Sequence, residues 1–515
     1  MTQYAWVIDQ TRCIGCHACT TACKSENDVA LGVFRTWVKA VEVGRFPEVR
    51  RHFAVLRCNH CEQPPCVDIC PVTAMYQRPD GLVDFDHDRC IGCKACMQAC
   101  PYDAIHMDPD SNTAAKCNFC SHRVDEGLLP ACVVVCPEEA LLFGDLEDAT
   151  SAVSRALGKH AVTVRRPEQS TRPKAYYIGA HEAALDPLAA RHDAMYMWAD
   201  AGDRGTGGQG DGTVSRRTAR TPVPPSPRPP ALPARVAYDI PRQRTWDWKV
   251  SSYIWTKSIA AGAGLFAAVE HAVGTAAGSL LPQLFMPLVA LIFLTLTGVL
   301  LVADLKRPER FWFVLAKAQW KSWLARGAVI ITLFGTLLAI WIAGLWTGSD
   351  RTLDLAAWPL GLLSLATATY TAFLFAQCEG RDLWQGPLFG IELALEAPLA
   401  ALAVVCVAAT GARAADAAEL TRQVAGLTTL LTAVILFDAF GRHGTPNARA
   451  AAHALTRGRQ ATMFWTALLA GFAAPVLLLL QAGANALPIA GVLILAGLWL
   501  RGHAFVLAGQ GPPIS

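Results

Sequence analysis

The chain has 515 residues, 53% of them apolar, and a formal net charge of +3. This length exceeds what one hydrophobic core usually serves, so we expect two or more domains. The basic residues form no stripe of the kind that binds nucleic acid, so a nucleic-acid partner is excluded.

Cysteines dominate the N-terminal end: of 18 in the chain, 16 lie between Cys13 and Cys136. The run "RCIGCKACMQACP" at residues 89–101 has the C-x2-C-x2-C-x3-C-P spacing with which bacterial ferredoxins hold [4Fe–4S] clusters. Disulfides suit small secreted domains, and zinc sites usually separate their C-x2-C pairs by a longer loop. The repeated close spacing therefore favours iron–sulfur clusters over both alternatives.

The 16 cysteines fall into four groups of four. They are Cys13, Cys16, Cys19, Cys23; Cys58, Cys61, Cys66, Cys70; Cys90, Cys93, Cys96, Cys100; and Cys117, Cys120, Cys132, Cys136. In two-cluster ferredoxins the fourth cysteine of a group ligates the neighbouring cluster. The groups thus predict four [4Fe–4S] clusters in an α+β ferredoxin-like domain of two pseudo-symmetric dicluster units, residues 1–150. Clusters with four cysteine ligands offer no position for a substrate, so we expect them to relay electrons.

The stretches between groups predict two β-hairpins. "CPVTAMYQRPDGLVDFDHDRC" and "CPYDAIHMDPDSNTAAKC" contain Asp-Gly and Asp-Pro turn signals between short apolar runs.

Residues 1 to about 150 resemble the electron-transfer subunit of the dimethyl sulfoxide and polysulfide reductase families, in all four cysteine groups. The resemblance implies that the first group shares its clusters with the fourth, and the second with the third. The implied ligand sets are Cys13, Cys16, Cys19 with Cys136; Cys117, Cys120, Cys132 with Cys23; Cys58, Cys61, Cys66 with Cys100; and Cys90, Cys93, Cys96 with Cys70.

Residues 151–245 are predicted to form an extension and a linker. "AGDRGTGGQGDG" and "TPVPPSPRPPALPAR" are too rich in glycine and proline to build a core. A proline-rich ligand for a recognition domain is the alternative interpretation.

After residue 245 the chain predicts an all-α transmembrane bundle, residues 246–505, because apolar runs near 20 residues long follow one another. The expected spans are 250–272, 283–304, 324–346, 356–378, 387–410, 424–441, 461–480 and 485–503. Eight spans put both termini on one side. We therefore expect a multi-pass protein of a bacterial or archaeal inner (cytoplasmic) membrane.

The distribution of Lys and Arg predicts the orientation. The face shared with the N-terminus carries Arg242, Arg244, Lys249, Lys306, Arg307, Arg310, Lys317, Lys321, Arg326, Arg381, Arg442, Arg449, Arg457, Arg459 and Arg501, and the opposite face Arg351, Arg413 and Arg422. The positive-inside rule then places the cluster domain in the cytoplasm, unless some of these residues instead dock the cluster domain.

"TKSIAAGAGLFAA" and "DLKRPERFWFVLAKAQWKSWLARGA" resemble the polysulfide reductase membrane-anchor (NrfD-like) family. That family exchanges electrons with a membrane quinone and carries no haem. The resemblance brings Tyr253 and Tyr370 onto positions that line its quinone pocket, although a relative has histidine in place of Tyr253. We expect the quinone to be bound by Tyr253, Trp255, Arg326, Gln377 and Glu396.

Ionisable residues inside apolar spans indicate function, because each is costly in hydrocarbon unless it faces a cavity or a partner. Lys257, Asp304, Glu392 and Glu396 all gather toward the N-terminal face. We expect Glu392, Tyr370, Asp304 and Lys257 to be the catalytic residues. Glu392 and Glu396 lie on one helix face; Lys257 could alternatively snorkel to the interface, and Asp304 could order a loop.

The sequence therefore predicts a fused electron-transfer and membrane-anchor subunit of a respiratory oxidoreductase. Its partner would be a separate catalytic subunit carrying molybdenum or tungsten on a pterin. An alternative is an ion-translocating, quinone-linked module that other soluble redox partners feed. A ferredoxin merely tethered to the membrane would need no buried carboxylates. No feature of the sequence selects the partner's substrate or the direction of electron flow.

Overall fold

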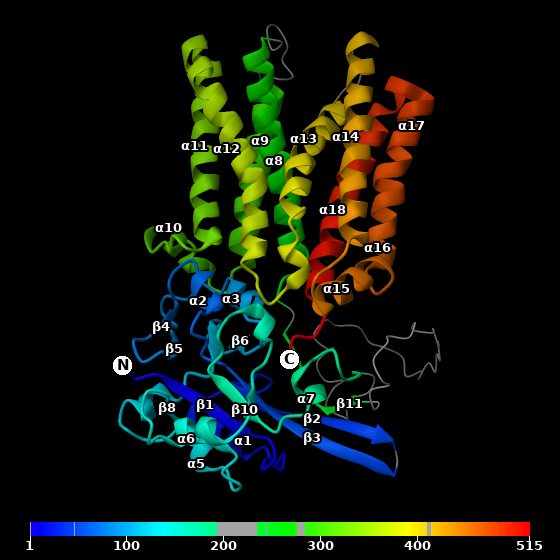
Figure 1. Cartoon of the computed structure of the whole chain (residues 1–515). Coiled ribbons are helices and arrows are strands. Elements are labelled where there is room, and N and C mark those ends of the chain that lie inside the picture. Colours follow the sequence, from blue (N-terminus) through cyan, green and yellow to red (C-terminus); the bar gives the residue numbers. More distant parts are fainter. Residues whose placement is uncertain (1, 46, 193–233, 244, 275–283, 409–413) are drawn as a thin grey trace.

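The computed structural model describes residues 2–45, 47–192, 234–243, 245–274, 284–408 and 414–515. A cysteine-rich half built from short strands and helices carries a bundle of long helices on one side, and the C-terminus returns to the junction between the two halves (Figure 1). The glycine- and proline-rich linker lies outside the described residues.

The first strand of the chain lies in the middle of a sheet that later segments complete. β1 (Tyr4–Asp9) pairs antiparallel with β8 (Leu141–Asp145) and parallel with β10 (Ala175–Ile178), and β10 also pairs with β9 (Val162–Thr163). A parallel neighbour requires a crossover connection. Segments after residue 150 therefore belong to the same sheet as β1.

A second sheet is made by a long hairpin and a strand from beyond the linker. β2 (Thr36–Arg45) and β3 (Glu48–Arg57) pair in register, and β11 (Ala234–Tyr238) pairs antiparallel with the other edge of β2. The first long helix begins at Trp248, soon after β11 ends. The cysteine-rich half is thus closed by a strand immediately before the helical half.

The two hairpins predicted between cysteine groups are confirmed. β4 (Met75–Gln77) pairs with β5 (Val83–Phe85), and β6 (Ile105–Met107) pairs with β7 (Ala114–Lys116). Short helices complete this half: α1 (Ala18–Glu26), α2 (Pro65–Asp68), α3 (Ala95–Ala99), α4 (Ser121–Val124), α5 (Ala131–Val134), α6 (Ala152–Lys159), the 3-10 turn η1 (Pro167–Gln169) and α7 (Glu182–Leu185).

The helical half follows the predicted apolar runs. Its elements are α8 (Trp248–Val273), α9 (Met286–Asp304), η4 (Pro308–Arg310), α10 (Phe313–Ala316), α11 (Trp323–Thr347), α12 (Asp350–Ala376), η5 (Asp382–Gln385), α13 (Phe389–Ala408), α14 (Ala414–Phe440), α15 (Pro446–Thr456), α16 (Ala461–Thr466), the π-helix η6 (Ala467–Ala473), α17 (Ala474–Ala482), η7 (Gly483–Ala486) and α18 (Leu487–Gly509).

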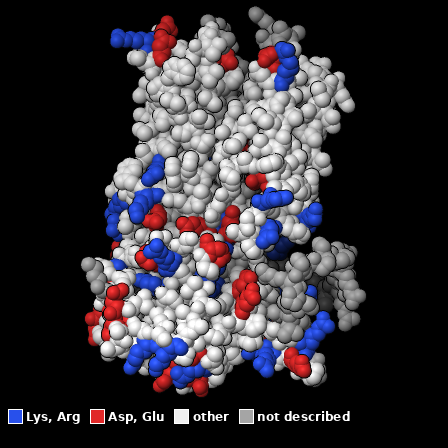
Figure 2. Space-filling view, in the orientation of Figure 1, with Lys and Arg blue, Asp and Glu red and all other residues white. Residues whose placement is uncertain are grey.

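Six stretches of the described residues are long and apolar enough to cross a membrane: α9, α11, α12, α13, residues 417–440 and residues 461–509. The expected count of eight stays a prediction, because α8, which contains Lys249, Lys257 and Glu270, lies outside this set and residues 461–509 count as one stretch. On the face seen in Figure 2, charged side chains gather at the two ends of the helical half and are sparse between them. The chain is therefore a multi-pass membrane protein.

The α8 helix occupies the interior of the helical half, where it packs against α9, α12, α13 and α18. Its buried residues include Lys257 and Tyr253. Because protein rather than lipid surrounds α8, polar side chains on this helix can find partners.

Candidate functional site

Cysteines from different groups converge on shared cavities. One cavity is lined by Cys13, Cys16, Cys19 and Cys136, a second by Cys23, Cys117, Cys120 and Cys132, and a third by Cys70, Cys90, Cys93 and Cys96. These are three of the four ligand sets that the family resemblance implies.

The fourth set is identified by its electrostatic neighbours. Burial, followed by the nearby Cys58 thiol and then Cys100, raises the pKa of the Cys61 thiol. Burial and then Cys100 and Cys58 likewise raise the pKa of Cys66. Cys58, Cys61, Cys66 and Cys100 therefore lie together, with cysteines of the second and third groups in one set.

Each group bends its backbone in the same way. The residue before the second cysteine has a positive φ in all four groups: 71° at Gly15, 42° at His60, 68° at Gly92 and 60° at Phe119. This conformation is uncommon for residues other than glycine and persists only where the surroundings hold it. The repeated turn wraps each loop around its cavity.

Backbone amides point at the sulfurs, as an anionic metal site requires. The amide of Ala74 donates to Cys70 Sγ at 3.2 Å, that of Ala140 to Cys136 Sγ at 3.3 Å, and that of Ala114 to Cys90 Sγ at 3.4 Å. Such bonds stabilise thiolate sulfur and tune a cluster's potential. The donor sets and their surroundings therefore fit [4Fe–4S] clusters.

A single metal ion fits less well. Within the described ranges, no group of three or more His, Cys, Asp or Glu side chains converges closely enough to hold one ion. Zinc would need its sulfur ligands about 2.3 Å from one point. Four sulfurs arranged around a larger cavity are what a cubane needs.

The cysteine sets extend from the protein surface to the helical half. Cys16 is exposed, whereas the loop around Cys93 touches the membrane helices. The amide of Lys306 donates to Gly92 O at 3.2 Å, and Trp246 Nε1 donates to Cys93 O at 3.5 Å. One end of the row is thus open to a partner, and the other meets the bundle.

Asp304, predicted to be catalytic, joins the two halves. Its carboxylate pairs with Lys94 Nζ at 2.7 Å, and both side chains are nearly buried. Arg310 adds bonds from its NH1 to His87 O at 2.6 Å and to Cys90 O at 3.1 Å. This geometry corresponds to the loop-ordering alternative for Asp304.

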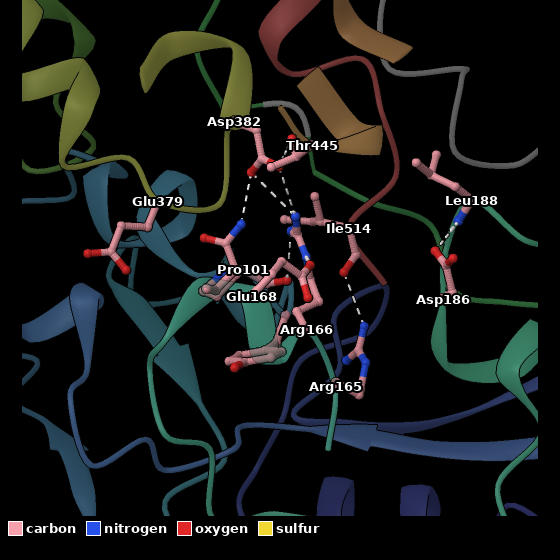
Figure 3. A network of polar contacts seen from close by, with 12 residues as sticks. Pro101, Arg165, Arg166, Glu168, Asp186, Leu188, Glu379, Asp382, Thr445 and Ile514 are labelled. Atoms are coloured by element: carbon pink, nitrogen blue, oxygen red, sulfur yellow. Dashed lines mark hydrogen bonds and ion pairs between the residues drawn. The ribbon is translucent and has the colours of Figure 1, made fainter. Parts of the chain in front are cut away.

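A second junction surrounds Asp382, which begins η5 (Figure 3). Its carboxylate accepts from Arg166 NH2 at 3.3 Å, Gln169 Nε2 at 3.0 Å and Thr445 Oγ1 at 2.5 Å. Arg166 NH1 also donates to Pro101 O at 3.3 Å, directly after the last cysteine of the third group. The cluster half, η5 and the start of α15 are therefore fixed to one another.

Glu379 lies beside this junction in Figure 3, on a cleft of about 590 Å³ between the two halves. The cleft is also lined by Glu62, Asp68, Glu168 and Lys321. Burial, followed by the charge of Asp68, raises the pKa of Glu379 to about 7. Its carboxyl group can therefore exchange protons near neutral pH, beside the ends of the helices.

Inside the bundle, Lys257 is fully buried and does not reach the interface. Its Nζ donates to Ala368 O and to Thr371 Oγ1, each at 2.7 Å, and lies 4.8 Å from the Tyr370 ring centroid. A side chain at Gly327 would overlap that ring, so α11 can approach Tyr370 only because residue 327 is glycine. The snorkelling alternative for Lys257 is therefore wrong.

Tyr253 lies between this group and the cluster half. Tyr370 and then Cys378 are its nearest electrostatic neighbours, and Cys378 in turn has Cys93 as a neighbour. These residues make a buried series from the cysteine loop to Lys257.

Glu392 forms a buried ion pair on the other side of α8. Its Oε2 accepts from Arg501 NH2, and its Oε1 has no partner among the described residues. Glu396, one turn along α13, has Arg501 and Lys257 as electrostatic neighbours, and Asp438 on α14 also faces Arg501. Glu396 therefore connects the two groups of ionisable residues.

The other three candidates lie apart from these groups. Trp255 donates from Nε1 to Leu495 O at 2.9 Å and lines an apolar groove of about 600 Å³ with α13 and α18. Gln377 bridges Trp323 N and Lys321 O, both at 2.8 Å, and so ties α12 to the start of α11. Arg326 is exposed and stacks over Trp323, 4.9 Å from the ring centroid.

Sequence reasoning missed Arg501 and Lys94 as partners of candidate residues. The charge count places Arg501 among the basic residues at the membrane surface, although Arg501 lies inside the last apolar run. Because an ionisable residue inside a span is costly, this position could have identified Arg501 as a candidate. Lys94 had no such signal, because only the fold brings it to Asp304.

Comparison with known proteins gives matches to both halves. Residues 239–512 match the family model for polysulphide reductase, NrfD, and residues 5–71 and 49–146 each match a 4Fe-4S dicluster domain. A tetrathionate reductase subunit of Salmonella typhimurium is 46% identical over 193 residues, which are 37% of this chain and 77% of that protein.

Two further relatives also match about a third of the chain. A sulfite dehydrogenase subunit of Allochromatium vinosum is 40% identical over 200 residues, covering 35% of this chain and 83% of that protein. A polysulfide reductase polypeptide of Wolinella succinogenes is 38% identical over 179 residues, covering 34% and 94%.

Proposed function

Since the chain belongs to the polysulphide reductase NrfD family and joins that membrane domain to 4Fe-4S dicluster domains, we propose that it is a fused electron-transfer and membrane-anchor subunit of a respiratory oxidoreductase complex. It would pass electrons between a membrane quinone and a separate catalytic subunit through four [4Fe–4S] clusters. The observation that carries this proposal is the row of four cysteine sets from exposed Cys16 to the Cys93 loop on the bundle.

The catalytic partner would carry molybdenum or tungsten on a pterin and bind at the Cys16 end. Exposed apolar side chains surround this end: Ile14, Leu128, Leu129, Val134 and Val135. Such patches on a soluble surface are typical of protein–protein interfaces. Each cluster, when bound, carries one electron at a time, so the two-electron chemistry belongs to the two ends.

The membrane end would bind the quinone near Lys257, Tyr370 and Tyr253, because these residues continue the buried series that begins at the Cys93 loop and Cys378. Buried Lys257 can donate a hydrogen bond to a quinone oxygen, and Glu396 and Glu392 can accept the protons that a quinol releases. The apolar groove beside Trp255 offers a surface for the hydrocarbon tail.

We propose eight spans and the division 1–150, 151–245 and 246–505. At 1.5 Å per residue the 26 residues of α8 reach about 39 Å, which is enough to cross. Gly483, with φ of 54°, and η7 lie within residues 461–509, where the proposed seventh and eighth spans would be separated. Within the extension, β10 and β11 each pair with a strand of the cluster domain.

The first test is the metal content. Anaerobically purified protein should contain about 16 iron and 16 sulfide per chain, four of each for every set of four cysteines. The measurement is iron and acid-labile sulfide against protein concentration. Stoichiometric zinc with little sulfide would contradict the cluster assignment.

The second test is the orientation. The side chains of Arg307 and Arg310 donate to the cluster loops, so we leave these two residues out of the positive-inside count. Arg442, Arg449, Arg457 and Arg459 on the same face still support a cytoplasmic cluster domain. A protease added outside intact cells should leave that domain whole, whereas permeabilised cells, as the control, should show cleavage in the predicted linker. Cleavage there in intact cells would place the domain outside.

An ion-translocating module is the second candidate, and the buried group formed by Glu392, Arg501, Asp438 and Glu396 favours it. Quinone turnover in sealed vesicles separates the candidates. The measurement is the number of protons moved per quinone converted. An ion-translocating module moves additional protons across the membrane, whereas a quinone site alone exchanges only the protons of the quinone reaction.

A further inference from the structure

The second and fourth cysteine groups open with the same pattern. "RCNHC" at residues 57–61 and "KCNFC" at residues 116–120 each place a basic residue before the first cysteine. The two loops face each other, because the rings of His60 and Phe119 stack at 3.8 Å between centroids and 24° between planes. Cys58 and Cys117 are electrostatic neighbours across this contact. The two loops therefore lie between two of the cysteine sets, which are the central sets of the row. These sets are Cys23, Cys117, Cys120, Cys132 and Cys58, Cys61, Cys66, Cys100.

Arg57 reaches across the contact to the opposite set. Its side chain is fully buried, NH1 donates to Cys132 Sγ at 3.2 Å, and the guanidinium lies 4.3 Å from the Trp6 ring centroid. Nε and NH2 have no acceptor among the described residues. Its electrostatic neighbours are Cys132, Cys117 and Cys19.

Lys116 has the reciprocal position. It is also fully buried, donates from Nζ to Cys117 O at 3.0 Å and to Val83 O, and is an electrostatic neighbour of Cys66 in the other central set. Each basic residue thus precedes a cysteine of one central set in the sequence and is an electrostatic neighbour of a cysteine in the other central set.

A buried guanidinium that lacks a carboxylate partner is costly, and a neighbouring anion offsets this cost. Arginine stays protonated in proteins, so it cannot avoid the cost of burying its charge by losing a proton. Four thiolates around an iron–sulfur cluster are such an anion. The two unpartnered guanidinium nitrogens, on the wall of the cavity lined by Cys117 and Cys132, have the geometry to face it.

We propose that Arg57 is a positioning residue that raises the reduction potential of the cluster held by Cys23, Cys117, Cys120 and Cys132, and that Lys116 does the same for the other central cluster. This inference rests on the proposed four-cluster function. Reduction makes a cluster more negative, so a fixed cation in a low-dielectric interior stabilises the reduced form. Higher reduction potentials at the two central clusters would favour the reduced state of these clusters, at the place where the two dicluster units meet.

The experiment is a redox titration of the full-length protein, followed by electron paramagnetic resonance, after iron has been counted in each variant. Arg57→Met should lower the midpoint potential of this cluster by at least about 59 mV, a tenfold change in the one-electron equilibrium. A smaller decrease is expected at the cluster held by Cys13, Cys16, Cys19 and Cys136, because Cys19 is also an electrostatic neighbour of Arg57. Arg57→Lys should recover most of the shift. Lys116→Met should lower a different midpoint.

The control is Lys39→Met. Lys39 is fully buried in the same half and its Nζ has no acceptor among the described residues, but its electrostatic neighbours are Asp239, Arg165, Arg242 and Asp186, with no cysteine. All four midpoints should stay unchanged in this variant.

The outcomes separate the inference from the function on which it rests. Unchanged midpoints in fully loaded Arg57→Met, or an equal shift in Lys39→Met, would overturn it. If Arg57→Met binds less iron, Arg57→Gln, which retains a donor for Cys132 without the charge, should load and show the lowered midpoint. Loss of the cluster from both uncharged variants, with Arg57→Lys loaded, would give Arg57 a purely structural role. Wild-type protein without 16 iron would instead contradict the proposed function.

Discussion

Glu392→Gln is expected to slow reduction of the clusters by a quinol analogue by about 10²-fold or more, the usual scale for losing a general base. Dithionite should still reduce the clusters, because Glu392 lies in α13 of the membrane half and lines none of the cysteine cavities. Glutamine keeps the shape of the side chain and one acceptor but cannot take a proton. The measurement is the rate of cluster bleaching after mixing with a reduced quinone.

The geometry supports this expectation through the free carboxylate oxygen. Arg501 engages Oε2, whereas Oε1 has no partner among the described residues and can accept a proton. Asp354→Asn is the control, since that exposed carboxylate pairs with His271 away from the cluster half. Equal rates in Glu392→Gln and wild type would remove Glu392 from the mechanism and make Lys257 and Tyr370 the next residues to test.

Arg501→Met is expected to destabilise the membrane half by about 3–5 kcal/mol, because it leaves Glu392 buried without its counter-charge. Arg501 and Glu392 are both almost completely buried. The double variant Glu392→Gln, Arg501→Met should recover much of the loss, since it removes both charges. The measurement is the midpoint of thermal unfolding in one detergent for the wild type and the three variants.

Arg422→Met provides the comparison for an exposed pair. Arg422 and Glu419 form an ion pair on α14 in which both side chains are largely exposed, and such pairs contribute little. A double variant less stable than Arg501→Met would show that the loss in Arg501→Met does not come from leaving the Glu392 charge without its partner.

The cysteine sets could be anticipated because their information is local. Spacing within each group predicts a cluster, and the family resemblance implies the exchange of fourth cysteines that the cavities around Cys136, Cys23 and Cys70 reflect. The hairpins between groups were likewise predictable from turn residues, as β4–β5 and β6–β7 confirm.

What could not be anticipated depends on contacts between distant segments. No local pattern pairs β10 with β1 or β11 with β2, because strand partners are chosen by the whole fold. Lys94 and Asp304 are 210 residues apart, and the bonds of Gln377 join two helix ends. Lys257, Glu392 and Glu396 are buried, but the sequence pattern does not reveal their partners.

The place of β11 in the fold has a consequence for biosynthesis. The sheet around β2 is complete only when the ribosome has passed Tyr238, and the first membrane helix begins soon afterwards at Trp248. At about 5–20 residues per second, the stretch from residue 150 to 238 takes roughly 4–18 s to translate. Because Trp248 follows Tyr238 closely in the chain, completion of this sheet and the arrival of α8 at the insertion machinery fall within nearly the same interval of translation.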